Sequence, residues 1–357
     1  MKAAVGILDG IFKQLKLKAK VRECRMEGAF LICDALLEPG GKVIKVERHA
    51  MEIALAMKAL AEPLIYPVPA EGIIRIELMM SLPGDIPFAD VVSSSEFQKS
   101  NGKLPLGLGR TRRGKILVAD LAAMPHLLVA GATGSGKSMI LQAAINSLLL
   151  NRSDRRVMLA LVDPKQVEFS YYERIPHLFC PIARDVQSAH EVLESLVAEM
   201  DRRFTVLQKK RCRDISHYKG KMPYIVLIVD ELADLMMASK KSVQDLICRL
   251  AQKSRACGIH LMVATQRPST DVVTGVIKAN FPSRLSCHVS SAIDSRVVLD
   301  KNGAEKLAGR GDAILDGPDF PFVRFKGAFL SEADIAANIR RCGGTSLWRR
   351  LWTANGT

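Results

Sequence analysis

The sequence predicts an α/β fold in which helices cover a mainly parallel sheet, preceded by a small α+β domain. Three observations support this: apolar runs that alternate with helix-like segments, a glycine-rich turn between one such run and a helix, and a second run that ends in two carboxylates. Alternating strands and amphipathic helices are typical of parallel sheets covered on both faces. With 357 residues, the chain is long enough for two domains of ordinary size.

Shifts in composition divide the chain into five consecutive parts. In chain order, they are a basic N-terminal segment (1–27), a small α+β domain (28–92), a polar linker (93–103), the main α/β domain (104–341) and a short tail (342–357). The first part is expected to be a helix or a disordered arm. Within the small domain, the apolar pattern predicts strands at 29–32, 42–47 and 73–77 and a helix at 50–60.

The glycine-rich turn has the spacing G-x-x-x-x-G-K-S and lies between a predicted strand at 126–130 and a predicted helix at 138–150. Glycine lacks a Cβ, so backbone N–H groups can wrap a phosphate, and the helix N-terminus adds partial positive charge. Lys137 is expected to reach the β- and γ-phosphates of ATP, and Ser138 to offer its hydroxyl to Mg²⁺. The alternative is a turn that only resembles a phosphate-binding loop. The expected ATP-binding residues are Gly131, Ala132, Thr133, Gly134, Ser135, Gly136, Lys137 and Ser138.

The second pattern is an uninterrupted aliphatic run at 224–229, followed by Asp230 and Glu231. Such a run suits a parallel strand buried on both faces, whose carboxyl end borders the crevice where ligands bind. Asp230 is expected to hold Mg²⁺ together with Ser138, and Glu231 to activate the attacking water. An acidic N-cap on the following helix is the alternative for this pair, and both roles can coexist.

Two further residues are candidates for the site. Gln266 follows a predicted strand at 259–264, where its amide can sense the γ-phosphate or orient the attacking water. A turn set by the next two residues, Arg-Pro, is the alternative. Arg255 ends a helix just before that strand, so it either favours the helix C-terminus electrostatically or projects into the nucleotide site of a neighbouring subunit.

Composition bears on partners and location. The net charge of +14 and the pI near 9.5 favour a polyanionic partner, nucleic acid first and an acidic membrane surface second. The eight cysteines form no C-x-x-C pair, so they are expected to be reduced thiols of a cytoplasmic protein. No apolar stretch reaches the ~18 residues of a membrane span. The basic residues gather at 13–25, 110–115, 152–156 and 209–213.

Together these motifs resemble the motor region of the FtsK/SpoIIIE family of double-stranded DNA translocases. The matching segments, in order, include 124–138, 162–165, 175–178, 229–236, 264–269, 277–280, 289–291 and 294–296. The resemblance implies a RecA-like P-loop ATPase that assembles as a ring of six around duplex DNA, with ATP at subunit interfaces. It assigns phosphate sensing to Gln266. It also suggests Arg255 as the arginine finger that acts on a neighbour, with Arg284 in reserve.

Two departures from the family qualify the resemblance. Full-length members usually carry membrane helices and a C-terminal winged-helix module, and residues 342–357 are too few for that module. This predicts a stand-alone soluble motor. Leu232 and Arg310 stand where the family often has other residue types, and neither is expected to touch the chemistry.

Two other functions stay open at this stage. One is an export ATPase of the same superfamily, although such proteins often string several ATPase modules together and attach to a membrane. The other is a nucleotide-dependent DNA-binding or initiator protein. The hydrolytic set of Asp230, Glu231 and Gln266 weighs against it, because a binding module has no need of one.

Overall fold

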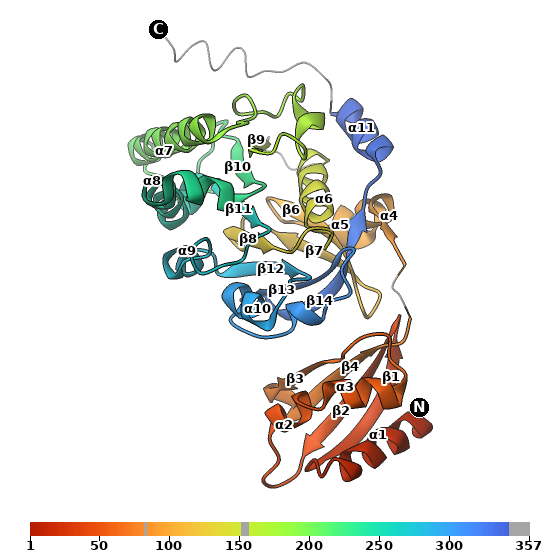
Figure 1. Cartoon of the computed structure of the whole chain (residues 1–357). Helices are drawn as coiled ribbons and strands as arrows, with labels where there is room; N and C mark the ends of the chain where they lie inside the picture. Colours follow the sequence, from red (N-terminus) through yellow and green to blue (C-terminus); the bar gives the residue numbers. More distant parts are fainter. Residues whose placement is uncertain (82–83, 151–156, 343–357) are drawn as a thin grey trace.

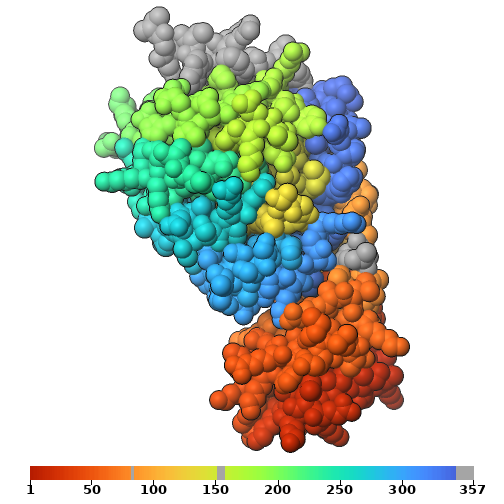
Figure 2. Space-filling model, in the orientation of Figure 1, coloured from red at the N-terminus to blue at the C-terminus, as the bar shows by residue number. Residues whose placement is uncertain are grey.

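The computed structural model describes residues 1–81, 84–150 and 157–342, which form a small domain and a main domain (Figure 1). Residues 152–156 of one basic group, and the predicted tail beyond Cys342, lie outside this range. The space-filling view shows the small domain as a lobe set against the main domain (Figure 2). No helix of the described ranges is long and apolar enough to cross a membrane.

The small domain is a four-stranded antiparallel sheet of order β1-β2-β4-β3 with helices on one face (Figure 1). Its elements are α1 (Lys2–Gln14), β1 (Ala19–Glu27), β2 (Phe30–Leu37), α2 (Val43–Glu47), α3 (Ala50–Met57), β3 (Leu64–Val68), η1 (Pro69–Glu71) and β4 (Ile73–Met79). Residues 2–27 therefore do not form a separate basic segment. Leu8, Ile11 and Phe12 of α1 are buried in the core of this domain, and β1 pairs with β2 along its whole length.

The predicted strand at 42–47 is wrong, because these residues form α2. Its β-branched residues suggested a strand, but Val46 is buried in the core while Ile44 remains 54% exposed. One face of a short helix satisfies that pattern, since β propensity yields to tertiary packing. The predicted linker at 93–103 also contains structure. It includes the end of α4 (Phe88–Ser93) and α5 (Ser95–Gln98), whose Phe97 is buried.

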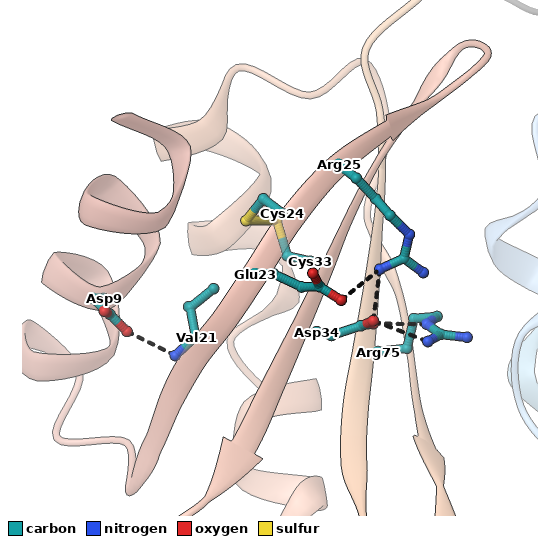
Figure 3. The surroundings of a disulfide bond; sticks show 8 residues. All are labelled: Asp9, Val21, Glu23, Cys24, Arg25, Cys33, Asp34 and Arg75. Atoms are coloured by element: carbon teal, nitrogen blue, oxygen red, sulfur yellow. Dashed lines mark hydrogen bonds and ion pairs between the residues drawn. A yellow bond between two sulfur atoms is a disulfide. The ribbon is translucent and has the colours of Figure 1, made fainter. Parts of the chain in front are cut away.

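The prediction of free thiols is wrong for Cys24 and Cys33, which form a disulfide between β1 and β2 (Figure 3). The register of the hairpin places the two residues directly opposite each other. A search for closely spaced cysteines misses a pair joined by strand pairing. Both sulfurs lie on the helix-covered face, whereas Arg25, Asp34 and Arg75 extend from the other face (Figure 3).

The main domain is built on a sheet of ten strands. These are β5 (Ile86–Pro87), β6 (Pro105–Thr111), β7 (Ile116–Asp120), β8 (His126–Ala130), β9 (Val157–Val162), β10 (Tyr224–Val229), β11 (Ile259–Thr265), β12 (Ser283–Cys287), β13 (Asp312–Gly317) and β14 (Phe320–Phe329). Their order is β7-β6-β14-β13-β12-β8-β11-β10-β9, with β5 beside β14. The α/β class is confirmed. The run from β12 to β9 is parallel, and β13, β14, β6 and β7 extend it as an antiparallel half that the alternation did not predict.

Helices cover both faces of the parallel half (Figure 1). The main-domain helices not yet given are α6 (Lys137–Leu149), η2 (Ser170–Tyr172), α7 (Val186–Lys209), α8 (Leu232–Lys253), η3 (Ser254–Cys257), α9 (Gly275–Asn280), α10 (Ala292–Leu299), η4 (Ala304–Lys306) and α11 (Glu332–Arg341). Alternate residues of β10 belong to two separate cores, Val226 and Ile228 with α6, Ile225 and Leu227 with α7 and α8. Burial on both faces explains why these strands read as uninterrupted apolar runs.

Candidate nucleotide-binding site

The glycine-rich turn connects the carboxyl end of β8 to the first residue of α6, as predicted. Gly134 and Gly136 have φ angles of 76° and 103°, which are left-handed conformations that glycine adopts without steric cost. At Gly136 a Cβ would lie 2.3 Å from the backbone nitrogen of Gly311. The first N–H groups of α6 have no partner within the helix, and together with the turn they suit an anion.

A cavity of about 470 Å³ lies over this turn. Such a volume is within the range of small-molecule sites. Its lining includes Thr133, Lys137, Ser138, Glu168, Gln266 and Arg310.

Lys137 and Asp230 form a buried ion pair beside the cavity. The ammonium Nζ donates to the Oδ1 atom of Asp230 at 2.6 Å and to its main-chain oxygen at 2.8 Å. These bonds use two of the three N–H groups of Lys137, so the third can reach a phosphate oxygen. The sheet order explains the meeting, because β11 alone separates β8 from β10 and all three strands end at the same edge.

Glu231 is buried, and several donors converge on its carboxylate. Oε1 accepts from the Thr265 hydroxyl at 2.7 Å and from the backbone N–H of Ala233 at 3.2 Å. Oε2 accepts from the Lys165 ammonium at 3.1 Å and from the backbone N–H of Gln266 at 3.1 Å. The bond to Ala233 makes Glu231 the N-cap of α8, so the acidic-cap alternative also describes this residue.

The Gln266 side chain lines the cavity and contacts the glycine-rich turn. Its Oε1 accepts a hydrogen bond from the Thr133 hydroxyl at 3.1 Å. Its backbone N–H contacts the Glu231 carboxylate. Gln266 therefore connects the glycine-rich turn to the Glu231 carboxylate that follows β10.

Three residues at the site were given no role by sequence reasoning. Lys165 and Glu168 lie in the segment after β9, whose carboxyl end borders the same edge of the sheet as β10. Their position directly after a predicted parallel strand was the sequence signal that could have placed them at the site. Arg310 was expected to stay away from the chemistry, but it lines the cavity, because Gly311 donates its N–H to the Ser135 carbonyl oxygen in the turn.

Neither candidate finger arginine reaches the cavity of its own chain. Arg255 is exposed in η3, just before β11 begins and therefore at the opposite edge of the sheet from Thr265. Arg284 is held within its own chain, where it donates to the Phe281 carbonyl oxygen at 3.1 Å and pairs with Asp300. Of the two, Arg255 is the more available to a second copy.

Cys287 packs behind the glycine-rich turn and is fully buried. A Cβ at Gly131 would lie 2.7 Å from the Cys287 Cβ, which shows how closely β12 supports the turn. Burial raises the pKa of the Cys287 thiol to about 12. The thiol is therefore neutral near pH 7 and serves packing rather than nucleophilic chemistry.

The chemistry of Ser138, which lines the cavity, and of buried Asp230, which pairs with Lys137 of the lining, fits a magnesium ion. Asp230 Oδ2 is buried without a hydrogen-bond partner, next to the Lys137 pair, and it is a hard oxygen ligand of the kind that Mg²⁺ prefers. Within the described ranges, no three His, Cys, Asp or Glu side chains gather as a closed metal site. A magnesium ion here would therefore share its shell between Ser138, Asp230, nucleotide phosphates and water, as is usual for this ion.

Comparison with known proteins agrees with the expected family. The FtsK/SpoIIIE family pattern matches residues 88–223 and 218–270, which together cover just over half of the chain. DNA translocase FtsK of Caldanaerobacter subterraneus subsp. tengcongensis is 42% identical over 93% of this chain and 48% of that protein. DNA translocase SpoIIIE of Bacillus subtilis (strain 168) is 41% identical over 92% of this chain and 44% of that protein. The chain thus spans less than half the length of these curated relatives.

Solved structures share the fold. The pCW3 conjugation coupling protein TcpA, in its monomer form with ATPγS, has a TM-score of 0.66 at 22% identity, covering 95% of this chain and 99% of that chain. The cytoplasmic domain of the type VII secretion ATPase EccC from Thermomonospora curvata has a TM-score of 0.64 at 24% identity, covering 74% of this chain and 35% of that chain. At these identities the likeness concerns architecture alone.

Proposed function

Because the chain belongs to the FtsK/SpoIIIE family, we propose that it is an ATP-driven motor that moves along double-stranded DNA. The observation that carries the proposal is the clustering of four features: the glycine-rich turn, the Lys137–Asp230 pair, the Glu231 carboxylate and the Gln266 amide. The turn, Lys137 and Gln266 line the cavity, while Asp230 and Glu231 are buried and bond to these lining residues. A binding module needs only the first of these four features. Relatives about 40% identical over nine-tenths of the chain are named DNA translocases, which supports DNA as the polymer along which the motor moves.

Hydrolysis is proposed to divide among these residues as follows. The turn from Gly131 to Ser138 binds the phosphates of ATP, and Lys137 donates its third N–H to a phosphate oxygen. Mg²⁺, held by Ser138 and Asp230, would neutralise the charge that develops on the transferred phosphoryl group. Glu231 accepts a proton from the attacking water, for which the water must replace Lys165, its most exposed partner, on Oε2. Gln266 contacts the terminal phosphate. When that phosphate is released, Gln266 shifts, and its backbone contact with Glu231 changes with it.

Assembly as a ring, expected to be a hexamer, would complete the site. Arg255 cannot reach the cavity of its own chain, but its exposed guanidinium is available to a neighbouring copy. An arginine supplied in trans stabilises charge in the transition state and links hydrolysis to subunit contacts. The net charge of +14 would attract the phosphates of duplex DNA without regard to sequence.

We propose the cytoplasm as the working compartment, where ATP and duplex DNA are both available. The Cys24–Cys33 disulfide is compatible with that location because both residues are buried in the small domain, and exchange with cellular thiols depends on access.

The direct test is ATP turnover with and without long duplex DNA. We expect stimulation that rises with duplex length and falls as salt weakens phosphate contacts. Lys137→Ala should lose nucleotide binding and turnover, whereas Glu231→Gln should bind ATP without hydrolysing it. A wild-type rate indifferent to DNA at low salt, in protein shown to be assembled, would reject the translocase and favour an export ATPase. If Glu231→Gln hydrolysed ATP at the wild-type rate, Glu231 would not be the general base.

A further inference from the structure

Glu168 is a carboxylate in the cavity to which neither the sequence motifs nor the proposed mechanism gives a role. Its Oε1 accepts a hydrogen bond from the Ser138 hydroxyl at 2.5 Å. Ser138 is the residue of the glycine-rich turn expected to bind Mg²⁺. A carboxylate that accepts from this hydroxyl therefore lies next to an expected ligand of the magnesium ion.

Glu168 is fixed to α6 at two points one helical turn apart. Its side chain contacts Ser138, and its main-chain oxygen accepts from the Gln142 side-chain amide at 2.7 Å. Residues four apart on a helix lie on the same face, so the segment after β9 lies along α6. The next residue, Phe169, is buried, and its N–H donates to Asp163 at 2.9 Å, which anchors the segment from the other side.

The group to which the Ser138 hydroxyl donates its proton determines what the hydroxyl oxygen of Ser138 can bind. A serine hydroxyl has one proton and two lone pairs. When the proton is donated to Glu168, both lone pairs are left for a cation and the proton is kept away from it. Partners that orient a metal ligand in this way commonly change metal affinity by about tenfold or more.

The local charge points to the same role. One oxygen of Asp230 already pairs with Lys137, so that carboxylate is largely neutralised before a cation arrives. Glu168 is a second carboxylate, and it lies within hydrogen-bonding distance of Ser138. Mg²⁺ usually keeps several waters and is bound through one or two carboxylates, so Glu168 can also accept hydrogen bonds from those waters.

We propose that Glu168 is a positioning residue for magnesium: it takes the Ser138 proton and directs the Ser138 oxygen at the cation of the ATP complex. This inference rests on the proposed ATP and Mg²⁺ site. In this proposal Glu168 acts through Ser138, whereas Asp230 offers a carboxylate oxygen directly to the magnesium ion. This role also gives the segment after β9 a part in binding the magnesium ion.

The test separates metal binding from nucleotide binding and from folding. The affinity of the full chain for a fluorescent ATPγS analogue is measured in EDTA, and MgCl₂ is then titrated into the complex. For Glu168→Gln and Glu168→Ala we expect unchanged affinity in EDTA and an increase of about tenfold in the Mg²⁺ concentration at half-saturation. Glu173→Gln is the matched control, because Glu173 lies five residues further on and pairs with Arg184 instead. Mn²⁺ followed by electron paramagnetic resonance gives a second readout.

Two results would overturn the inference while leaving the proposed function intact. One is a wild-type Mg²⁺ dependence in both Glu168 variants. The other is an equal loss of affinity in EDTA and in Mg²⁺, which would mean that Glu168 only supports the shape of the turn. If the wild-type chain bound no nucleotide under any condition, the proposed function itself would fail and the inference with it.

Discussion

At the scale of single residues, the position of the Glu231 carboxylate depends on the donors around it, and the Thr265 hydroxyl is the nearest of them. Thr265→Val keeps the shape of the buried side chain and removes that donor. A hydrogen bond to a charged group contributes about 1.5–3 kcal/mol, so turnover should fall about tenfold or more with ATP affinity unchanged.

Thr265→Ser is the matched control because it retains the hydroxyl, and it should keep most of the activity. Steady-state turnover and equilibrium nucleotide binding are the measurements. Equal rates for the valine variant and the wild type would show that Thr265 does not hold the base.

The sequence motifs predicted some of these residues and not others for a physical reason. The glycine-rich turn and the Asp230-Glu231 pair are each encoded by adjacent residues with a fixed local geometry. Glu168 reaches Ser138 across 30 positions because the segment after β9 folds back on α6. Arg310 enters the cavity through the Gly311–Ser135 contact. No spacing rule in one sequence encodes such meetings.

At the scale of elements, the glycine-rich turn requires glycine at Gly136 more strictly than at Gly134. Both have left-handed backbones, which cost other residues about 1–2 kcal/mol. A Cβ at Gly134 meets nothing within 4 Å, whereas one at Gly136 collides with Gly311. Gly136→Ala should therefore destabilise the chain more than Gly134→Ala in urea unfolding. Equal midpoints for the two variants would contradict the contact with Gly311.

The stability of the small domain is predicted to depend on pH through Asp34 in its sheet. Asp34 is buried on β2 and accepts from Arg75 Nε at 2.7 Å and from Arg25 Nη1 at 2.7 Å (Figure 3). Burial alone would raise the pKa of Asp34, but the hydrogen bonds from both arginines outweigh it and hold the pKa below its ordinary value. The stabilisation is therefore complete above the unfolded pKa of about 4 and is lost as pH falls through the lower folded value.

Asp34→Asn should thus destabilise the small domain by about 3 kcal/mol at pH 7, because buried Arg75 loses its buried charge partner and keeps only the half-exposed Glu71. The difference from wild type should shrink below about pH 4. Hydrogen exchange of the β1, β2 and β4 amides in the full chain measures this locally. A difference that stays constant from pH 7 to pH 3 would contradict the assignment.

Elements buried on both faces were the most predictable ones. The predicted runs at 126–130 and 224–229 coincide with β8 and β10, because such strands need apolar residues at every position. Among the half-buried elements, α1 matches one of the two structures expected for the N-terminal segment, whereas β1 was missed and α2 was misread as a strand. Their patterns make sense only against the sheet that they cover or join.

At the scale of the whole molecule, the small domain is linked to the nucleotide site through charged residues. Buried Glu77 of β4 pairs with Arg324 of β14, and Arg324 pairs with Asp312 at 2.6 Å. The residue before Asp312 is Gly311, which contacts the glycine-rich turn. These ion pairs therefore join the small domain to the segment that contacts the glycine-rich turn.

The proposed ring makes a prediction about mixtures of variants. Arg255→Ala should bind ATP normally and hydrolyse it poorly, since an arginine finger can contribute ~10³ or more in rate. Mixing it with Lys137→Ala should restore activity, because some interfaces then pair an intact turn with an intact arginine. Absence of rescue in rings shown to mix would remove Arg255 and point to Arg284.

Movement along duplex DNA driven by ATP is most directly tested by displacement of a third strand. A triplex-forming oligonucleotide is bound near one end of a long duplex, and its release is followed after addition of protein and ATP. The proposed function predicts release that is delayed in proportion to the length of duplex before the triplex. Release should be absent with ATPγS and in Glu231→Gln. ATP turnover without release of the third strand at any duplex length would contradict translocation.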